Sequence, residues 1–423
     1  MKHTFTNAHA HIFTVKHAPD YFLKTAINNT AMAEFVERLL QTKTTSVLLS
    51  GVHWLFGRIL YPHKREVVDR YIEFVKMGTA ATQKDIFDQI SKTYTKYGDF
   101  KIIVLTQVFD YLDVERDSNH IKVETQVEQV AELKRNALYQ KILYPFLGID
   151  PRQTGIDLLT EWTQKYINKD MGFYGIKIYP AYGFFPFDKR LDPVWAWAEA
   201  NEVPVMTHCT RGGSYYLGTF DSIFNNAVLD FSDYPENDPY VNKIIDRLSS
   251  LSNDKSIQKN NHYWCNVFGN PDNYRLILSK YPKLKICLAH LGGSNEVIRS
   301  QAVNKSDKDY PDYLQDNWYE EVIQLMKDYT NVYSDISYTL SDKNAMDIIV
   351  KMFTDRSLID LNGTPLINKL MYGTDFYLTQ QEELGDEPDL QTIFTTKFQK
   401  PEINLLAYQN PTNYLSSKIH DED

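Results

Sequence analysis

Cysteine, an excess of basic charge and long apolar runs are all missing or scarce in this sequence, and each absence excludes a class of protein. Only three cysteines occur among 423 residues, which gives no disulfide framework like those of small secreted domains. The formal net charge is -10, with acidic and basic residues interspersed, so no basic face is expected for nucleic acid or anionic lipid. We therefore expect reduced thiols, no nucleic-acid partner and no membrane partner.

The chain also lacks the apolar segments that target or anchor proteins. No run of about 18 apolar residues occurs, as a transmembrane helix would require. The N-terminus carries Lys2 followed by polar residues and histidines, unlike a signal peptide. These features predict a soluble, cytoplasmic protein. Apolar residues are nevertheless plentiful, at 43% hydrophobic and 13% aromatic, so the chain can bury a large core and is not globally disordered.

Short apolar runs alternate with helix-compatible segments along most of the chain. We predict a first strand at about 6–13 and further strands at 101–110, 141–150, 174–180, 203–209, 284–291, 331–337 and 369–376. Such alternation is typical of a parallel sheet with helical crossovers. Eight strands are the number in a (β/α)8 TIM barrel, whose active face lies at the carboxyl ends of the strands. The run at 46–52 lacks clear turn signals and is not counted.

Two stretches are too long to be simple connections. Residues of about 20–98 are rich in helical spacing and are expected to form a helical insertion after the first strand. Residues of about 212–268 are expected to form a long loop after the fifth strand, which serves as a lid or as an oligomer contact. A homo-oligomer is therefore one option. We predict a single α/β domain over 1–423 that carries these two additions.

Ligand-type side chains stand at the ends of the predicted strands. His9 and His11 lie two positions apart, so on a strand both would project from the same face. A pair of this kind can also arise by chance on an amphipathic strand. Three further apolar runs end at His208, His290 and Asp375, however, and barrel strands bring their carboxyl ends together. Imidazole and carboxylate groups with room for water are typical of a catalytic divalent metal site.

The order of these motifs resembles the amidohydrolase superfamily. The residues that carry the resemblance are His9-x-His11, His208 at the end of the fifth strand, His290 in AHLGG and Asp375 in YGTDF. The segments YPKLKICLAHLGG, NVYSDIS and NPTNYL are similar to its amidohydrolase-related branch, which includes lactone hydrolases and aminocarboxymuconate-semialdehyde decarboxylase. The resemblance implies that His9, His11, His208 and Asp375 bind a divalent metal, expected to be zinc. It also implies that His290 polarises the substrate or moves a proton.

Lys177, in GIKIYP at the end of the fourth strand, leaves the number of metal ions open. In two-metal members of the superfamily a lysine at this strand end is carboxylated and bridges the ions. In one-metal members it is absent or faces the substrate, and a buried lysine can also be simply ion-paired. Arg211 could hold a substrate carboxylate or phosphate, or form a surface ion pair. Asp335, which ends the seventh strand, is a candidate for orienting a ligand histidine.

Two reactions are compatible with this set of residues. In the first, the protein is a metal-dependent hydrolase in which activated water attacks a C–N or C–O bond of a small amide, ester or lactone, and Asp375 moves the proton. In the second, it is a metal-dependent non-oxidative decarboxylase or hydratase of a small carboxylic acid, which Arg211 would hold. The sequence hardly separates these two. A non-catalytic metal-binding barrel is disfavoured because the full ligand set is present.

Overall fold

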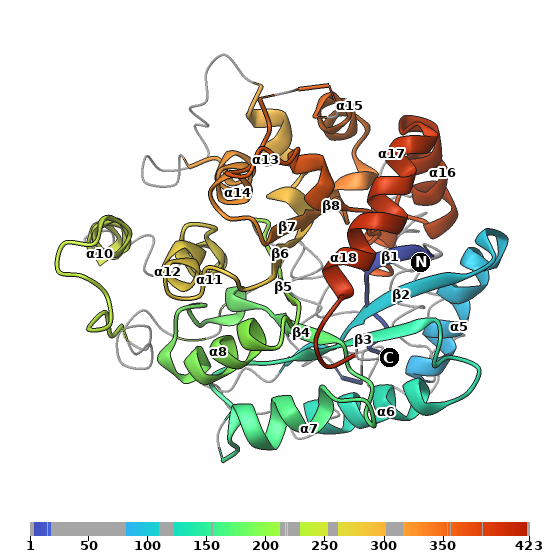
Figure 1. The fold of residues 1–423 in the computed structure, drawn as a ribbon, viewed down its shortest axis with the longest axis horizontal. Helices are drawn as coiled ribbons and strands as arrows, with labels where there is room; N and C mark the ends of the chain where they lie inside the picture. The colour runs from blue at the N-terminus through green and yellow to red at the C-terminus, as the bar shows by residue number, and fades with distance from the viewer. Residues whose placement is uncertain are drawn as a thin grey trace, which may run out of the picture.

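Eight parallel strands form the centre of the fold (Figure 1). Their hydrogen-bonding order follows the sequence, and their bounds are β1 Phe5–Ala10, β2 Phe100–Leu105, β3 Leu143–Gly148, β4 Gly175–Ile178, β5 Val205–Thr207, β6 Ile286–Leu288, β7 Val332–Asp335 and β8 Leu370–Met371. The circle closes where Ala8 N–H donates to Tyr372 O (2.9 Å) and where Ala10 forms a parallel bridge with Phe376. The predicted (β/α)8 barrel is confirmed.

The computed structural model describes residues 4–14, 16–17, 82–109, 122–153, 155–211, 216, 218, 229–252, 261–301, 316–352, 354–355, 357–382 and 384–420. The run at 46–52 lies outside these residues. So do residues 20–81 of the predicted insertion and parts of the predicted long loop at 212–268.

Helices surround the strands, and each crossover carries at least one of them. The helices are α5 Gln83–Tyr94, α6 Val123–Arg135, α7 Gln164–Tyr166 with the π-helical segment Leu158–Thr163 before it, α8 Asp192–Ala200, α10 Pro239–Ser252, α11 Asn261–Gly269, α12 Asn273–Lys280, α13 Ser294–Arg299, α14 Trp318–Asp328, α15 Lys343–Lys351, α16 Glu387–Lys397, α17 Lys400–Asn404 and α18 Asn410–Leu415. A second π-helical segment, Leu405–Gln409, lies between α17 and α18.

Helix α5 occupies the last part of the stretch predicted as an insertion. It begins with a capping box, in which the Thr82 side chain accepts from Asp85 N–H and the Asp85 side chain accepts from Thr82 N–H. Its buried face includes Ile86, Ile90 and Tyr94, which recur at helical spacing. Because α5 packs against α6 and α16, it is the crossover helix between β1 and β2.

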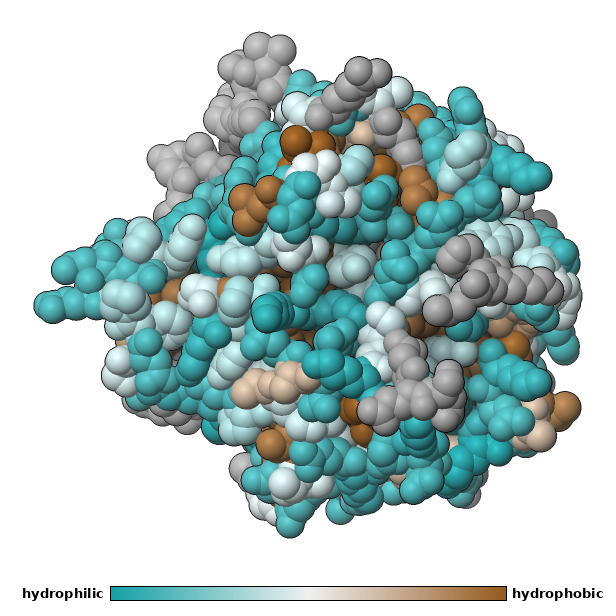
Figure 2. Space-filling model, in the orientation of Figure 1, coloured by the Kyte–Doolittle hydropathy of each residue, from teal (hydrophilic) through white to brown (hydrophobic). Residues whose placement is uncertain are grey.

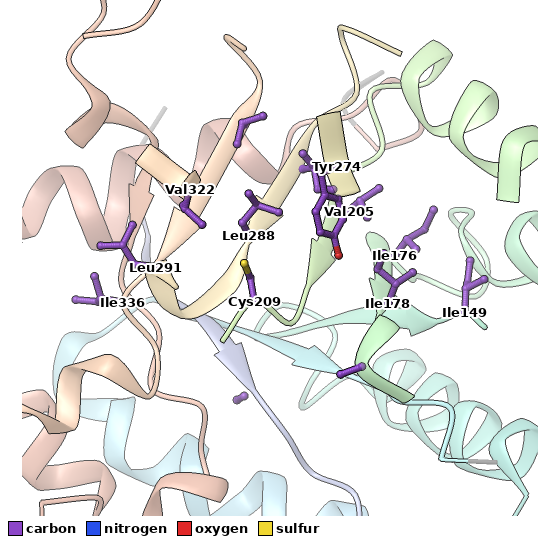
Figure 3. Packing of buried hydrophobic residues seen from close by; sticks show 14 of the residues in the cluster. Ile149, Ile176, Ile178, Val205, Cys209, Tyr274, Leu288, Leu291, Val322 and Ile336 are labelled. Atoms are coloured by element: carbon purple, nitrogen blue, oxygen red, sulfur yellow. The ribbon is translucent and has the colours of Figure 1, made fainter. Parts of the chain in front are cut away.

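The strands are buried on both faces, which explains their continuous apolar sequences. In β5, Val205 belongs to the cluster between strands and helices, whereas its neighbour Met206 belongs to the cluster inside the barrel. Figure 3 shows Ile176, Val205 and Leu288 in the outer cluster on neighbouring strands. The three cysteines are buried and none forms a disulfide, in line with the reduced thiols expected from the sequence.

Helix α18 closes the amino-terminal end of the barrel. The Tyr414 side chain packs on the interior residues Phe146 and Met371, and its hydroxyl donates to Val205 O (2.7 Å). The barrel is therefore filled from this end, and polar side chains inside it can gather only towards the carboxyl ends of the strands.

The described parts of the predicted long loop are largely helical. Helix α10 packs on α12, and α11 packs on the turn Pro180–Tyr182 that follows β4; α10 lies at the periphery in Figure 1. Whether this region acts as a lid or an oligomer contact stays a prediction. None of the described helices is long and apolar enough to cross a membrane. On the face shown in Figure 2, hydrophilic residues predominate.

Candidate metal centre

Three ligand-type side chains meet at the carboxyl end of the barrel. Asp375 Oδ1 lies 3.2 Å from His9 Nε2 and 3.2 Å from His11 Nε2, and all three residues are buried. Zinc at about 2.0–2.1 Å from each ligand in a tetrahedral site places the ligand atoms about 3.3–3.4 Å apart. Asp375 Oδ1 therefore already stands, from each of the two imidazole nitrogens, close to the separation that a shared ion requires.

The hydrogen bonds of the imidazoles fix which ring nitrogen is free to bind. His9 Nδ1 lies 3.0 Å from Asp335 Oδ2, and His11 Nδ1 lies 3.3 Å from Leu105 O. A carboxylate and a carbonyl only accept, so each Nδ1 carries the proton and each Nε2 presents its lone pair towards Asp375. This arrangement of an oxygen acceptor behind a ligand histidine is the usual one at metal sites.

His208 and His290 continue the same chain of hydrogen bonds. His290 Nδ1 lies 3.0 Å from Ser337 O, so it donates, and His290 Nε2 then accepts from His208 Nδ1 (3.1 Å). The remaining nitrogen, His208 Nε2, keeps its lone pair. His208 is not within the close group of His9, His11 and Asp375, but its imidazole joins them through His290, whose ring centroid lies 4.8 Å from that of His9.

Buried polar atoms without partners mark the place where a cation would bind. Among the described residues, His9 Nε2, His208 Nε2, Asp375 Oδ1 and Lys177 Nζ are buried and accept or donate no hydrogen bond. Leaving a buried polar group unpaired costs about 1–3 kcal/mol, so this concentration calls for a missing ligand. Two imidazole lone pairs and a carboxylate oxygen fit a divalent ion.

The electrostatics of the site keep His11 and His290 neutral and favour a positive charge at His9. Burial lowers the pKa of His11 to about 4 and that of His290 to about 4, so both are neutral at physiological pH. Burial lowers the pKa of His9 as well, but Asp335 and Asp375 outweigh it and the net pKa lies above the usual value. Burial alone would raise the pKa of Asp375, yet His9 and His11 hold it well below its usual range. A cation can replace the proton that this negative site attracts.

Asp335 supports the site from behind. One carboxylate oxygen contacts His9, and the other accepts from the backbone N–H groups of His290 (3.0 Å) and Ser337 (3.0 Å). His9, His290 and Asp335 form a second close group of ligand-type atoms. Because these hydrogen bonds already occupy Asp335, we assign it the orienting role expected from the sequence, and not a ligand role.

Lys177 projects from β4 into a small cavity beside the cluster. The cavity has a volume of about 10 Å³ and is lined by Gln107, Asp150, Lys177, Tyr179 and Tyr182, among others. Lys177 is 1% exposed, and burial lowers its pKa to about 8 although Asp375 and Asp335 act in the opposite direction. The ammonium is therefore close enough to the cluster to interact electrostatically with both carboxylates.

Arg211 is held by partners other than the metal-site residues. Its Nε donates to Glu296 Oε1 (3.1 Å), its Nη2 donates to Asp316 O, and its guanidinium lies 4.9 Å from the Trp318 ring centroid. The side chain is only 6% exposed. The ion pair considered from the sequence is thus present, but it is buried and not on the surface. A contact between Arg211 and substrate stays a prediction.

All eight strands end earlier than their apolar runs suggested, and of the cluster residues His290 and Asp375 lie furthest beyond the ends of their strands. His290 was expected within the sixth strand, but β6 ends at Leu288 and His290 adopts a left-handed conformation with φ 67°. The AHLGG turn needs Gly292, because a Cβ there would lie 2.5 Å from Tyr319 N. Likewise β8 ends at Met371 and Asp375, with φ 57°, follows in a turn. Non-glycine residues in this conformation often mark functional sites.

The contact of Tyr179 with His208 was not predicted from the sequence. Its ring stacks on the His208 imidazole, with centroids 4.3 Å apart and planes at 14°, and Tyr182 stacks on its other face at 4.4 Å. This stack fixes the plane of His208. An aromatic residue two positions after Lys177, on the same face of the strand end, was the only available signal.

Gly373 is required for the close approach of β8 to the metal-site residues. A Cβ at this position would lie 2.9 Å from His9 Cβ and 3.1 Å from Ser337 Cβ.

We expect Gly373→Ala to displace His9 and to weaken zinc binding about tenfold or more, as measured by chelator competition. Gly363→Ala is the control, because no described atom lies within 4 Å of its added Cβ; equal zinc affinities in the two variants would contradict the expectation.

A family model described as amidohydrolase matches residues 130–415. The chain belongs to the amidohydrolase family. The match begins within α6, so β1 lies outside it, and His9 and His11 are linked to the matched region by the closure of the barrel. Among curated proteins, none matches this amidohydrolase in sequence.

Solved structures similar to this amidohydrolase share little sequence with it. A probable 2-pyrone-4,6-dicarboxylic acid hydrolase from Acinetobacter baumannii, with citric acid bound, has 11% identity and a TM-score of 0.47, covering 97% of this chain and 99% of its own. An amidohydrolase from Burkholderia multivorans with bound zinc has 10% identity and a TM-score of 0.42, covering 78% and 87%. A 4-oxalomesaconate hydratase from Rhodopseudomonas palustris has 12% identity and a TM-score of 0.44, covering 97% and 95%.

Proposed function

We propose that this amidohydrolase is a metal-dependent hydrolase that cleaves a C–N or C–O bond of a small amide, ester or lactone. His9, His11 and Asp375 would hold one divalent ion, expected to be zinc, with His208 as a further donor. The observation that supports this most strongly is the approach of His9 Nε2 and His11 Nε2 to 3.2 Å from the buried Asp375 Oδ1. When bound, the ion would supply Lewis acidity, which lowers the pKa of water and polarises a carbonyl group.

The chain's own residues would bind the substrate and move protons. Asp375 is ionised at neutral pH, because its pKa is well below the usual range, so it can accept a proton from the attacking water and pass it to the leaving group. His290 is neutral and holds its Nδ1–H towards Ser337 O (3.0 Å). It thereby keeps Nε2 as the acceptor for His208. It lies beside His9, where it would orient the substrate, and it would take up a proton at Nε2 only if its hydrogen bond with His208 is released.

The test of this proposal combines metal analysis with a substrate survey. Protein purified without chelator should contain about one divalent ion per chain. A panel of lactones, esters, amides and aromatic acids, with product identification, should then give hydrolysis that is lost on stripping the metal and restored on adding zinc or manganese. Protein that retains no ion and rebinds none would contradict the proposal.

A non-oxidative decarboxylase or hydratase of a small carboxylic acid is the second candidate function. The observation in its favour is the buried ammonium of Lys177, which has no hydrogen-bond partner among the described residues. A substrate carboxylate would neutralise it. Arg211, which the sequence offered for this task, is already paired with Glu296. Release of carbon dioxide, or addition of water without cleavage, in the same panel would establish this function instead.

Substitution of Lys177 separates one-metal from two-metal chemistry. The described ligand atoms form one open group around Asp375, and the second group shares His9 with it, so we propose one ion and a substrate-facing ammonium. Lys177→Met should then leave the metal content unchanged and raise KM about tenfold for a carboxylate-bearing substrate. Elemental analysis and steady-state kinetics measure the two effects.

Lys134→Met is the matched control for this substitution. Lys134 is also a buried lysine with a pKa lowered to about 8 by burial, but its Nζ donates to Leu143 O (2.8 Å) at the start of β3, at the opposite end of that strand from the cluster. The Lys134→Met variant should be less stable than wild type, with unchanged metal content and unchanged KM. A metal content halved by Lys177→Met, with partial rescue by short-chain carboxylic acids, would instead show a carboxylated, bridging lysine.

A further inference from the structure

A buried polar network lies behind the metal-site residues, between β1, β8 and the outer helices α5 and α16. We call it the Tyr94 network, and it consists of Asn7, Tyr94, Tyr372, Thr374 and Glu387. All five side chains are at most 2% exposed. None of them takes part in the proposed reaction. Polar groups are costly to bury, so a network of this size inside the protein requires an explanation.

Asn7 joins the two metal-site segments. Its Nδ2 donates to Tyr94 OH (2.9 Å) and to Thr374 Oγ1 (2.8 Å). Its Oδ1 accepts from the backbone N–H of His9 (3.0 Å) and of Thr374 (3.2 Å). Both protons and the oxygen of this amide are therefore used, which fixes its orientation. One side chain thus holds His9 itself and the residue that precedes Asp375.

Tyr94 is the hub that connects Asn7 to the outer helices. Its hydroxyl donates to Glu387 Oε1, accepts from Asn7 and lies 3.1 Å from Tyr372 OH. Glu387 is the first residue of α16 and also receives a hydrogen bond from Gln391 (3.3 Å). Burial raises the pKa of Glu387, and hydrogen bonds from Tyr94, Thr374 and Gln391 oppose that shift.

The backbone of Asp375 needs such support. With φ 57° it occupies the left-handed region, which few residues other than glycine, asparagine and aspartate adopt. Its N–H donates to His9 O (2.9 Å), and the preceding Thr374 is held by Asn7 on both its backbone and its side chain. Strained conformations persist when the surroundings over-determine them, and here the Tyr94 network provides that constraint.

We propose that Tyr94 and Glu387 are positioning residues, which act through Asn7 and Thr374 to hold His9 and Asp375 at the spacing that a divalent ion needs. The inference rests on the proposed metal-dependent function. It differs from a merely structural role because it predicts a loss of metal affinity that is larger than the loss of stability can account for. Neither residue touches the ligand atoms.

Tyr94→Phe is the first test, because it removes only the hydroxyl and keeps the ring. The zinc affinity of chelator-stripped protein, measured by competition with a chromophoric chelator, should fall about tenfold or more, as for other groups that orient metal ligands. Tyr166→Phe is the matched control. Tyr166 is also fully buried and its hydroxyl donates to Glu128 Oε1 (2.7 Å), with no connection to the site. Its zinc affinity should stay within about twofold of wild type.

Glu387 provides an independent test with a built-in rescue. Glu387→Leu removes the acceptor and should weaken zinc binding as Tyr94→Phe does. Glu387→Gln keeps an oxygen that accepts from Tyr94 and should restore most of the affinity. Melting temperatures measured in parallel report the structural contribution. If Glu387→Leu does not fold, the zinc affinity of Tyr94→Phe alone tests the inference.

Two outcomes would be negative, and they differ. If Tyr94→Phe and Glu387→Leu bind zinc as tightly as wild type while melting lower, as Tyr166→Phe does, the network is only structural and the inference fails. If wild-type protein binds neither zinc nor another divalent ion, the proposed function fails, and the role of the network in metal binding fails with it.

Discussion

Replacing both His9 and His11 with alanine is expected to abolish divalent metal binding and, with it, the activity. The two imidazoles provide two of the three converging ligand atoms, and the remaining buried carboxylate of Asp375 cannot hold the ion with only the more distant His208 to help it. Elemental analysis after growth with zinc should find less than about a tenth of an ion per chain, against about one in wild type. The variant should show no turnover of any substrate that wild type hydrolyses.

The barrel should remain folded in this variant. Asp335 loses its contact with His9 but keeps hydrogen bonds from the backbone of His290 and Ser337, so a loss of about 1–3 kcal/mol is expected. His17→Ala is the control for loss of a buried imidazole. Its partners are Thr14 and Gln129, so metal content should be unchanged. Full metal content in the double variant would mean that the ion binds elsewhere.

Most residues of the cluster could be predicted from the sequence. The apolar runs of several strands are followed by a histidine or an aspartate, whose polar atoms need a hydrogen-bond partner or a ligand. His9 and His11 both reach Asp375, as their alternation predicted, although the pairing of β1 with β2 shifts register between Asn7 and Ala10. The alternation of residues along a strand is therefore enough to predict which side chains point into the barrel. A polar residue inside a buried strand, such as Asn7, is a further indication of the site, because its amide needs partners that only the neighbouring segments can provide.

The conformations after the strands could not be predicted in the same way. His290 and Asp375 both lie in left-handed turns, which follow from close backbone approaches that only the folded barrel creates. The protonated ring nitrogen of each histidine depends on acceptors that are distant in sequence, such as Leu105 O for His11. The pairing of Arg211 with Glu296, 85 residues away, is of the same kind. These contacts join residues that are far apart in the sequence, so they cannot be predicted from the pattern of neighbouring residues.

Asp375→Asn is expected to lower kcat/KM by about a thousandfold or more, because Asp375 is both the proposed proton acceptor and a proposed metal ligand. The substitution keeps the shape of the side chain, so the packing around it should be unchanged. His9 and His11 lose the anion that faces their Nε2 atoms. Metal affinity should therefore fall. The assay must be run at saturating zinc, so that a loss of kcat caused by an empty metal site is distinguished from a loss caused by the missing proton acceptor.

The separation works because the two roles respond differently to added metal. If Asp375 served only as a ligand, saturating zinc would restore kcat; if it also moves the proton, kcat stays low while the metal site is full. Asp360→Asn is the control, since Asp360 is a buried carboxylate paired with Lys369 (2.7 Å) at the other end of the strands. It should lose stability and keep its activity. Recovery of more than about a tenth of wild-type kcat in the metal-saturated Asp375→Asn variant would remove the proton-transfer role, which accounts for factors of about a hundred or more, and leave His290 as the remaining candidate.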